Sequence, residues 1–231
     1  AAEHGVAVTT TPGSNGETVA DFTLGLMLAG SRLIPQLDRT LKGGKWDPRK
    51  GNDVFGKTVG IAGLGRIGQG VARRAAAFSM VILGYDPYVD ATAMAAMGVR
   101  KVELDDLLAK SDFITLHMPA NEETTGMINA RAIELMKPTV FLVNTARGPL
   151  IDEPALLAAL QSGRIAGAGL DVFIDEPMEA SPFFELDNAI VSPHIAGNTA
   201  ESMARMAERA VDNVIAVEAG TCPPEYVVNG V

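Results

Sequence analysis

The chain has 231 residues, of which 47% are hydrophobic and 20% charged, and its formal net charge is −9. This composition predicts a globular protein with a sizeable core, and the acidic balance argues against nucleic acid or an acidic membrane surface as a partner. The single cysteine, Cys222, excludes an intrachain disulfide framework and fits a reducing cytoplasm. No metal-ligand spacing, signal-peptide pattern or apolar run of about 18 residues occurs, so we expect no metal site, no membrane span and a cytoplasmic location.

The first predicted elements are a hinge and a long helix. The chain begins within what reads as a strand-forming passage, and we expect a further N-terminal piece to precede it. Residues 9–16 are turn formers and predict the hinge. A single helix is predicted from there to Gly43-Gly44, because apolar residues continue at helical spacing. Its apolar residues surround much of its circumference, so we expect either the domain core alone or the core together with a second subunit to cover it.

From Gly56 onward, apolar runs alternate with helical patterns, which predicts an α/β fold with a doubly wound parallel sheet covered on both faces. The expected strands are Thr58–Ala62, Met80–Tyr85, Asp112–His117, Thr139–Asn144, Gly167–Asp171 and Ala189–Ser192. The expected helices between them are Ile67–Phe78, Asp105–Lys110, Ala130–Met136 and Glu153–Ser162. A last helix is expected from Thr199 to Ala219, and the chain then leaves the sheet domain.

The first expected strand runs directly into a glycine-rich turn that carries Gly63, Gly65 and Gly68. In a dinucleotide-binding fingerprint these glycines allow a tight turn, the approach of pyrophosphate and close helix–strand contact, and the helix N-terminus faces phosphate. Asp86 directly follows the next strand, where a carboxylate would meet the adenosine ribose of NAD and repel the extra phosphate of NADP. The pattern therefore predicts a Rossmann sheet that binds NAD, and an ordinary glycine turn is the alternative.

Polar side chains follow several strands at the edge where open parallel sheets bind their ligands. Arg147 follows an apolar strand, and its planar guanidinium could hold the carboxylate and the adjacent carbonyl oxygen of a 2-keto acid. The alternative is a structural ion pair with Asp152. His194 also follows a strand, and an imidazole suits proton transfer near neutral pH. A structural histidine is the alternative there.

A carboxylate beside His194 would hold one tautomer of its imidazole and favour the protonated form. Glu176 and Asp175 are both candidates, and their spacing does not decide between them. Asp171 could accept a hydrogen bond from a nicotinamide carboxamide or cap a turn, and we favour the cofactor role. His117 is interpreted as packing near the adenosine and is not assigned to catalysis.

Five blocks occur along the chain: Gly-Leu-Gly-Arg-Ile-Gly (63–68), Tyr-Asp-Pro (85–87), Asn-Thr-Ala-Arg-Gly (144–148), Leu-Asp-Val-Phe-Ile-Asp-Glu-Pro (170–177) and Ser-Pro-His-Ile-Ala-Gly (192–197). In this order they resemble the D-isomer-specific 2-hydroxyacid dehydrogenase family. The resemblance implies NAD-dependent interconversion of a D-2-hydroxy acid and its 2-keto acid by hydride transfer. It further implies a catalytic triad in which Arg147 clamps the substrate, His194 is the acid/base and Glu176, the acid directly before the proline, is its partner.

The same resemblance implies cofactor contacts along the strand ends. They are Gly63, Gly65, Arg66, Ile67 and Gly68 at the phosphates, Asp86 at the ribose, Thr145 and Ala146 at the nicotinamide, Asp171 at the carboxamide, and Pro119, Thr124 and Gly197 as further candidates. It also implies that residues 1–14 are a remnant of a flavodoxin-like substrate domain, that 15–197 are the NAD-binding domain with its dimer-forming helix, and that 198–231 return to the substrate domain. A homodimer is expected.

Family members carry about a hundred further N-terminal residues, a domain-sized piece that forms most of the substrate domain. We expect this chain to be part of such a longer protein; complete as printed, it would bind NAD but turn over poorly. The stretch 44–58 and the Tyr-Asp-Pro-Tyr block look most like 3-phosphoglycerate dehydrogenases, with glyoxylate/hydroxypyruvate reductases as the alternative. An NAD(H)-sensing dimeric interaction protein without turnover is the alternative from another class. The physiological substrate and the direction of flux stay open.

Overall fold

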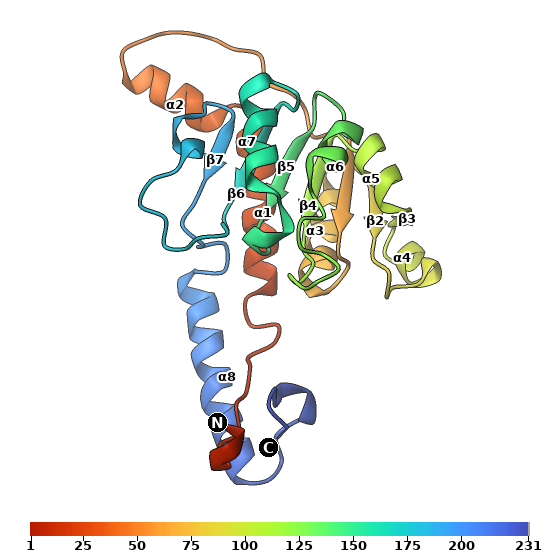
Figure 1. Ribbon diagram of the computed structural model, residues 1–231, viewed down its shortest axis with the longest axis vertical. Helices are drawn as coiled ribbons and strands as arrows, with labels where there is room; N and C mark the ends of the chain where they lie inside the picture. The colour runs from red at the N-terminus through yellow and green to blue at the C-terminus, as the bar shows by residue number, and fades with distance from the viewer. Residues whose placement is uncertain (231) are drawn as a thin grey trace.

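A seven-stranded parallel sheet forms the centre of the computed structural model, which describes residues 1–230 (Figure 1). The strands are β1 (Thr58–Ala62), β2 (Val81–Tyr85), β3 (Arg100–Lys101), β4 (Phe113–Leu116), β5 (Phe141–Asn144), β6 (Gly167–Leu170) and β7 (Ala189–Val191). Their spatial order is β3-β2-β1-β4-β5-β6-β7, and every neighbouring pair is parallel. The winding reverses between β1 and β4, so a ligand crevice is expected beyond the carboxyl ends of these two strands. The predicted doubly wound fold is confirmed.

Helices cover both faces of the sheet. On one face lie α1 (Gly16–Ser31) and α3 (Arg66–Ala77), which also pack on each other. On the other face lie α5 (Leu104–Lys110), α6 (Ala130–Leu135) and α7 (Glu153–Ser162), which stand in front of the sheet in Figure 1. The remaining short helices are α4 (Ala91–Ala96) and the 3₁₀ turns η1 (Ala2–His4), η2 (Gly148–Leu150), η3 (Pro182–Glu185) and η4 (Pro224–Tyr226).

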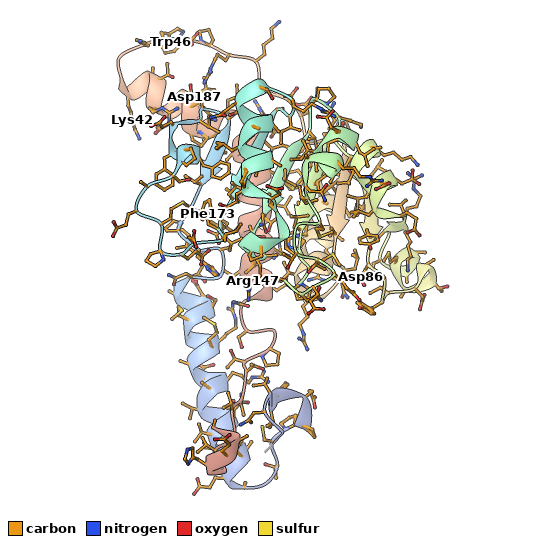
Figure 2. The ribbon with its side chains drawn as sticks, in the orientation of Figure 1. Lys42, Trp46, Asp86, Arg147, Phe173 and Asp187 are labelled. Carbon is orange, nitrogen blue, oxygen red and sulfur yellow. The ribbon has the colours of Figure 1, made fainter. Side chains whose placement is uncertain are left out.

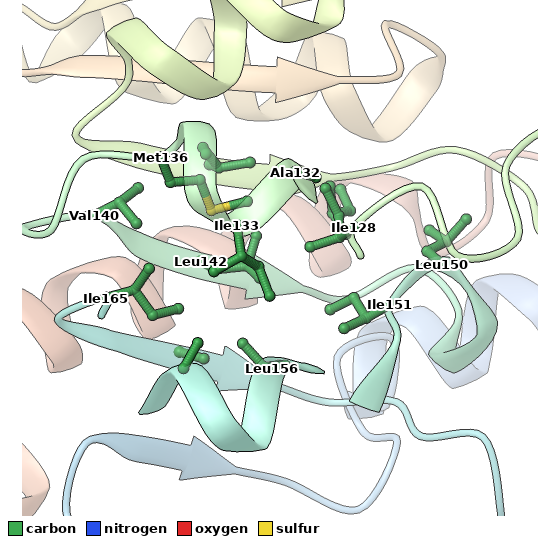
Figure 3. Close-up of a cluster of buried hydrophobic side chains, with 14 of the residues drawn as sticks. Ile128, Ala132, Ile133, Met136, Val140, Leu142, Leu150, Ile151, Leu156 and Ile165 are labelled. Carbon is green, nitrogen blue, oxygen red and sulfur yellow. The ribbon is translucent and has the colours of Figure 1, made fainter. Parts of the chain in front are cut away.

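The side chains between the sheet and its helices form two buried apolar clusters, one on each face. Figure 3 shows the cluster beneath α6 and α7, to which Leu142 of β5, Ile133 of α6 and Leu156 of α7 all belong. All three are at most 2% exposed. Burying an aliphatic side chain of this size contributes about 1.5–3 kcal/mol, so such a cluster holds the strands firmly. The loops at the strand ends are therefore anchored on a rigid frame.

The helix predicted to run to Gly43-Gly44 is two helices, so that prediction was wrong. The first is α1, and the second, α2 (Ile34–Lys42), begins after Leu33, whose φ of 56° lies in the left-handed region. Pro35 stands in the first turn of α2. A proline has no N–H for the carbonyl of Ser31, and its ring would clash with that carbonyl in a continuous helix. The apolar spacing continues through the proline, but the backbone does not.

The pair α4 and β3 was not predicted. The helix has only six residues, and Asp90 caps it by accepting a hydrogen bond from the Ala93 amide at 2.8 Å. The strand has two charged residues at the edge of the sheet, Arg100 and Lys101. Neither segment is long enough to show an apolar period, so the sequence pattern does not mark them.

The predicted last helix is α8 (Ala200–Glu218), and its N-cap is Thr199. It extends away from the sheet, and both chain ends lie beside it in Figure 1. The Thr10 amide donates to the Tyr226 carbonyl at 2.9 Å, and the Asn213 side chain donates to the Thr10 carbonyl at 2.8 Å. The two ends of the chain thus form one structural unit with α8. Among residues 1–230, no helix combines the length and the apolar character that a membrane crossing needs.

Candidate active site

A cavity of about 690 Å³ opens where β4, β5 and β6 end and α8 begins. We call it the arginine cavity because Arg147 lines it. Figure 2 shows Arg147 at the edge of the sheet nearest α8, Asp86 further along the same edge, and Trp46 at the opposite end of the domain. The residues with predicted roles that line this cavity are Ile67, Pro119, Thr145, Ala146, Arg147, Asp171, His194 and Gly197. The fold thus gathers most of them in one place.

His194 is paired with Glu176 and not with Asp175. The distance between His194 Nδ1 and Glu176 Oε2 is 2.7 Å. The other Glu176 oxygen accepts a hydrogen bond from the Phe173 amide at 2.8 Å. Partial burial raises the pKa of the Glu176 carboxyl, but these hydrogen bonds and the nearby charges of His194 and Arg147 outweigh it, so the pKa lies below its usual value. An ionised Glu176 fixes the imidazole and leaves Nε2 to exchange a proton.

Arg147 reaches the cavity from an extended loop after β5. Its guanidinium donates to the Ala146 carbonyl at 2.6 Å, and the side chain is exposed. The alternative ion pair with Asp152 is not formed, because Asp152 instead caps α7 by accepting from the Ala155 amide at 3.1 Å. In the part of the chain that the structure describes, no carboxylate lies within salt-bridge distance of Arg147. Most of its donors are therefore free for a carboxylate ligand.

Asp171 holds the loop that presents His194. Its carboxylate is fully buried and accepts from the Ser192 hydroxyl at 2.6 Å and from the Ile195 and Ala196 amides at 2.9 and 2.8 Å. Its carbonyl accepts from the His194 amide at 2.8 Å. His194 has a φ of 52°, a backbone conformation that non-glycine residues rarely adopt. Asp171 thus positions the histidine and also lines the arginine cavity.

Glycine geometry fits the predicted phosphate turn. Gly63 has a φ of 97°, and a Cβ there would lie 2.7 Å from the His117 carbonyl carbon. A Cβ on Gly68 would lie 1.9 Å from the Gly63 carbonyl oxygen, so only glycine fits. A Cβ on Gly65 would meet no atom within 4 Å. This open space above the N-terminus of α3 is where a phosphate could approach the backbone.

A smaller cavity of about 240 Å³, the aspartate cavity, adjoins this turn and is lined by Gly63, Gly65, Asp86, Pro119 and Thr124 among others. Asp86 is 9% exposed, and its two carboxylate oxygens accept from the Leu64 and Tyr88 amides at 2.8 and 2.9 Å. Each oxygen keeps a second lone pair for a ribose hydroxyl. The Thr124 hydroxyl donates to the Pro119 carbonyl at 2.6 Å, so it shapes the cavity wall.

Two predicted cofactor residues line neither cavity. Arg66 is the first residue of α3, and its side chain lies beside Gly13 of the linker. Gly68 is buried behind the turn, as described above. Among the residues that the sequence analysis left without a role, Asn144 donates to the Arg147 carbonyl at 2.8 Å and accepts from the Ala146 amide at 3.0 Å. Its place at the end of an apolar strand is the signal that could have indicated this bracing role.

His117 lines both cavities and joins them. Its two ring nitrogens are buried and have no hydrogen-bond partner within residues 1–230, although the residue as a whole is only partly buried. Burial lowers the pKa of its imidazole to about 3. The ring therefore stays neutral at physiological pH, and its place between the cavities agrees with packing near a bound dinucleotide. No group of three metal-ligating side chains occurs in the described chain.

The family model described as D-isomer specific 2-hydroxyacid dehydrogenase, NAD binding domain, matches residues 24–196. The chain belongs to this family. Its relatives include D-3-phosphoglycerate dehydrogenase of Mycobacterium tuberculosis and glyoxylate reductase of Korarchaeum cryptofilum, each 44% identical over 98% of this chain. The chain spans 43% of the length of the first and 70% of the second.

Solved structures of dehydrogenases and reductases share the fold. D-lactate dehydrogenase from Aquifex aeolicus, complexed with NAD and lactic acid, is 34% identical with a TM-score of 0.89, over 99% of this chain and 75% of that one. An acyclic imino acid reductase in complex with NADPH and D-Arg is 31% identical with a TM-score of 0.86, over 100% of this chain and 72% of that one. Membership of the NAD-binding-domain family and the glycine cradle agree on a dinucleotide, so NAD fits the two adjoining cavities.

Proposed function

We propose that this dehydrogenase-family domain interconverts a D-2-hydroxy acid and its 2-keto acid with NAD. The observation that carries the proposal is the pairing of His194 with Glu176 at 2.7 Å, because His194 also lines the cavity that holds the free donors of Arg147. These are the groups that a carbonyl reduction needs, an anion clamp and a positioned proton donor. They stand next to the glycine turn.

The chain's own residues divide the work. Gly63 and Gly65 would hold the pyrophosphate at the start of α3, Asp86 the adenosine ribose, and Thr145, Ala146 and Asp171 the nicotinamide end. When bound, NADH supplies a hydride from its nicotinamide ring. Thr145 is itself anchored, since its hydroxyl lies 2.9 Å from that of Thr23 on α1.

In the reducing direction Arg147 would bind the substrate carboxylate and polarise the adjacent carbonyl. His194 would give the proton on Nε2 to the carbonyl oxygen, and in the oxidising direction the same nitrogen would take it back. Glu176 would stabilise the protonated imidazole throughout. The three residues therefore have separate tasks on a single small substrate.

The proposed substrate is 3-phosphohydroxypyruvate, the 2-keto acid of 3-phosphoglycerate, with glyoxylate or hydroxypyruvate as the alternative. Relatives named D-3-phosphoglycerate dehydrogenase and glyoxylate reductase are equally similar to this chain, at 44% identity each. An NAD(H)-sensing interaction protein is the second candidate function. The observation that favours it is the exposed apolar side chains of α8, including Val214 and Ile215, which could form a surface for a partner protein.

The proposal includes a homodimer, a substrate domain and a cytoplasmic location. The segment after α2 exposes Trp46 at 86% and Phe55 at 73%, and apolar side chains of this size support a second subunit as their cover. The contacts between the chain ends and α8 support assigning residues 1–14 and 198–231 to the substrate domain. The single Cys222 supports a reducing compartment.

The test is NADH oxidation by the complete gene product with phosphohydroxypyruvate, hydroxypyruvate, glyoxylate and pyruvate as separate substrates. A strong preference for one of them supports the reaction and identifies the substrate. Saturable NADH binding without turnover on any 2-keto acid contradicts the proposed enzyme and favours the cofactor-sensing protein.

A further inference from the structure

The aspartate cavity carries a second carboxylate besides Asp86. Glu123 lines it from the loop after β4, and Tyr88 lines it from the loop after β2. The Tyr88 hydroxyl donates to Glu123 Oε2 at 3.4 Å, which brings the two loops together at the cavity. Both side chains are exposed, Tyr88 at 82%. The cavity therefore has one buried carboxylate in its wall and one free carboxylate at its rim.

The position of Glu123 is set by a tight turn. Asn121 Oδ1 accepts from the Glu123 and Thr124 amides, both at 3.0 Å, and the Asn121 amide donates to the Thr124 hydroxyl at 3.0 Å. Among the described residues that line the cavity there is no lysine or arginine, and none forms a salt bridge with Glu123. The charge at the rim is thus negative and without a countercharge, on a residue whose backbone the turn holds.

Asp86 and Glu123 differ in what their charges do. Both Asp86 oxygens accept backbone amides, so this carboxylate shapes the glycine turn as well as facing the cavity. Removing it would disturb the turn that holds the phosphates. The Glu123 carboxylate has only the Tyr88 hydroxyl as a partner, so its charge is available to act on a ligand.

We propose that Glu123, which accepts a hydrogen bond from Tyr88 at the rim of this cavity, is a second determinant of cofactor choice that rejects a phosphate on the adenosine ribose. This inference rests on the proposed NAD-binding function. The fold by itself does not fix the choice, since the imino acid reductase with the same fold is in complex with NADPH. A 2′-phosphate in this cavity would bring about two negative charges toward Glu123 and would find no cation among the lining residues.

The experiment measures the adenosine end alone. Calorimetric titration of the purified chain with 5′-AMP and with 2′,5′-ADP gives the ratio of the two dissociation constants, free of any nicotinamide contact. The variant is Glu123→Gln, and the matched control is Glu122→Gln, which removes one charge from the neighbouring residue that does not line the cavity. A thermal unfolding scan of each variant establishes that the fold is kept.

Glu123→Gln is expected to improve 2′,5′-ADP binding relative to 5′-AMP by about three- to tenfold, the effect of one close charge at a protein surface. Glu122→Gln should leave the ratio unchanged, and added salt should weaken the discrimination in the original protein. An unchanged ratio in Glu123→Gln with 5′-AMP still bound would overturn this inference alone. Loss of both nucleotides to the same extent would also overturn it. Failure of the original chain to bind 5′-AMP or NADH would overturn the proposed NAD function as well.

Discussion

The two ends of the crevice are built in different ways. At the glycine end the backbone is proposed to bind the cofactor, and its shape is fixed by close approaches such as the one between Gly68 and the Gly63 carbonyl. At the arginine end, side chains carry the proposed chemistry, and Arg147 and His194 are both exposed. Changes at the glycine end should therefore alter shape and stability together, whereas changes at the arginine end should alter chemistry and leave the fold intact.

The largest expected effect is at the arginine end. His194→Asn removes the proposed proton donor and should reduce turnover by about 10²–10⁴-fold, the usual contribution of general acid catalysis. NADH affinity, measured by its fluorescence, should stay close to that of the original protein. A matching loss of NADH binding would show that His194 has a structural role and would erase the contrast between the two ends.

A smaller loss is expected when Glu176 is replaced by Gln. A hydrogen bond to a charged imidazole contributes about 1.5–3 kcal/mol, which corresponds to about ten- to a hundredfold in rate. The pKa of the Glu176 carboxyl lies below its usual value, so activity of the original protein should fall only where acid protonates this carboxylate, and the Gln variant should lose that part of the pH dependence. A pH profile of turnover measures this. A loss of activity that is the same at every pH would contradict the proposed tie between Glu176 and the proton on His194.

Two glycine variants separate packing from phosphate binding at the glycine end. Gly68→Ala places a Cβ at 1.9 Å from a carbonyl oxygen and should lower the free energy of unfolding by about 1–3 kcal/mol. Gly65→Ala is its matched control, because its Cβ meets no protein atom and its φ of −69° suits alanine. Gly65→Ala should keep the stability but weaken NADH binding. Urea unfolding and NADH titration of both variants separate packing from phosphate binding, and equal behaviour would argue against this assignment.

The smallest effect concerns His117, which joins the two ends. Its pKa is about 3 in the fold and 6.5 when free, so below about pH 6.5 the unfolded chain binds a proton that the folded chain does not. Protonation of the unfolded chain therefore costs the fold nothing above that pH. Below it, the free energy of unfolding falls as the pH falls, by up to about 1.4 kcal/mol per pH unit. His117→Gln should flatten the fall in urea stability between about pH 6 and pH 5. An unchanged slope would place the acid sensitivity elsewhere.

The sequence predicted the sheet well because every central strand is an apolar run that ends in a chemically distinct residue. The elements that the sequence pattern did not predict have physical reasons for being missed. The break at Leu33 depends on a proline within a continuing apolar period, and β3 is too short to have a pattern. The site residues could be located from strand ends, but the choice of Glu176 over Asp175 came only from the family resemblance. The bracing by Asn144 and the rim carboxylate of Glu123 depend on loop geometry, which spacing does not encode.

We propose that one substrate oxygen lies between Arg147 and His194 beside a nicotinamide. The most direct test is a structure of the complete gene product with NADH and oxamate, an unreactive keto-acid analogue. We predict that the oxamate carbonyl oxygen lies within hydrogen-bond distance of both the Arg147 guanidinium and His194 Nε2, with the nicotinamide carbon about 3–3.5 Å from the carbonyl carbon. Oxamate bound away from Arg147, or a nicotinamide outside the arginine cavity, would contradict the claim.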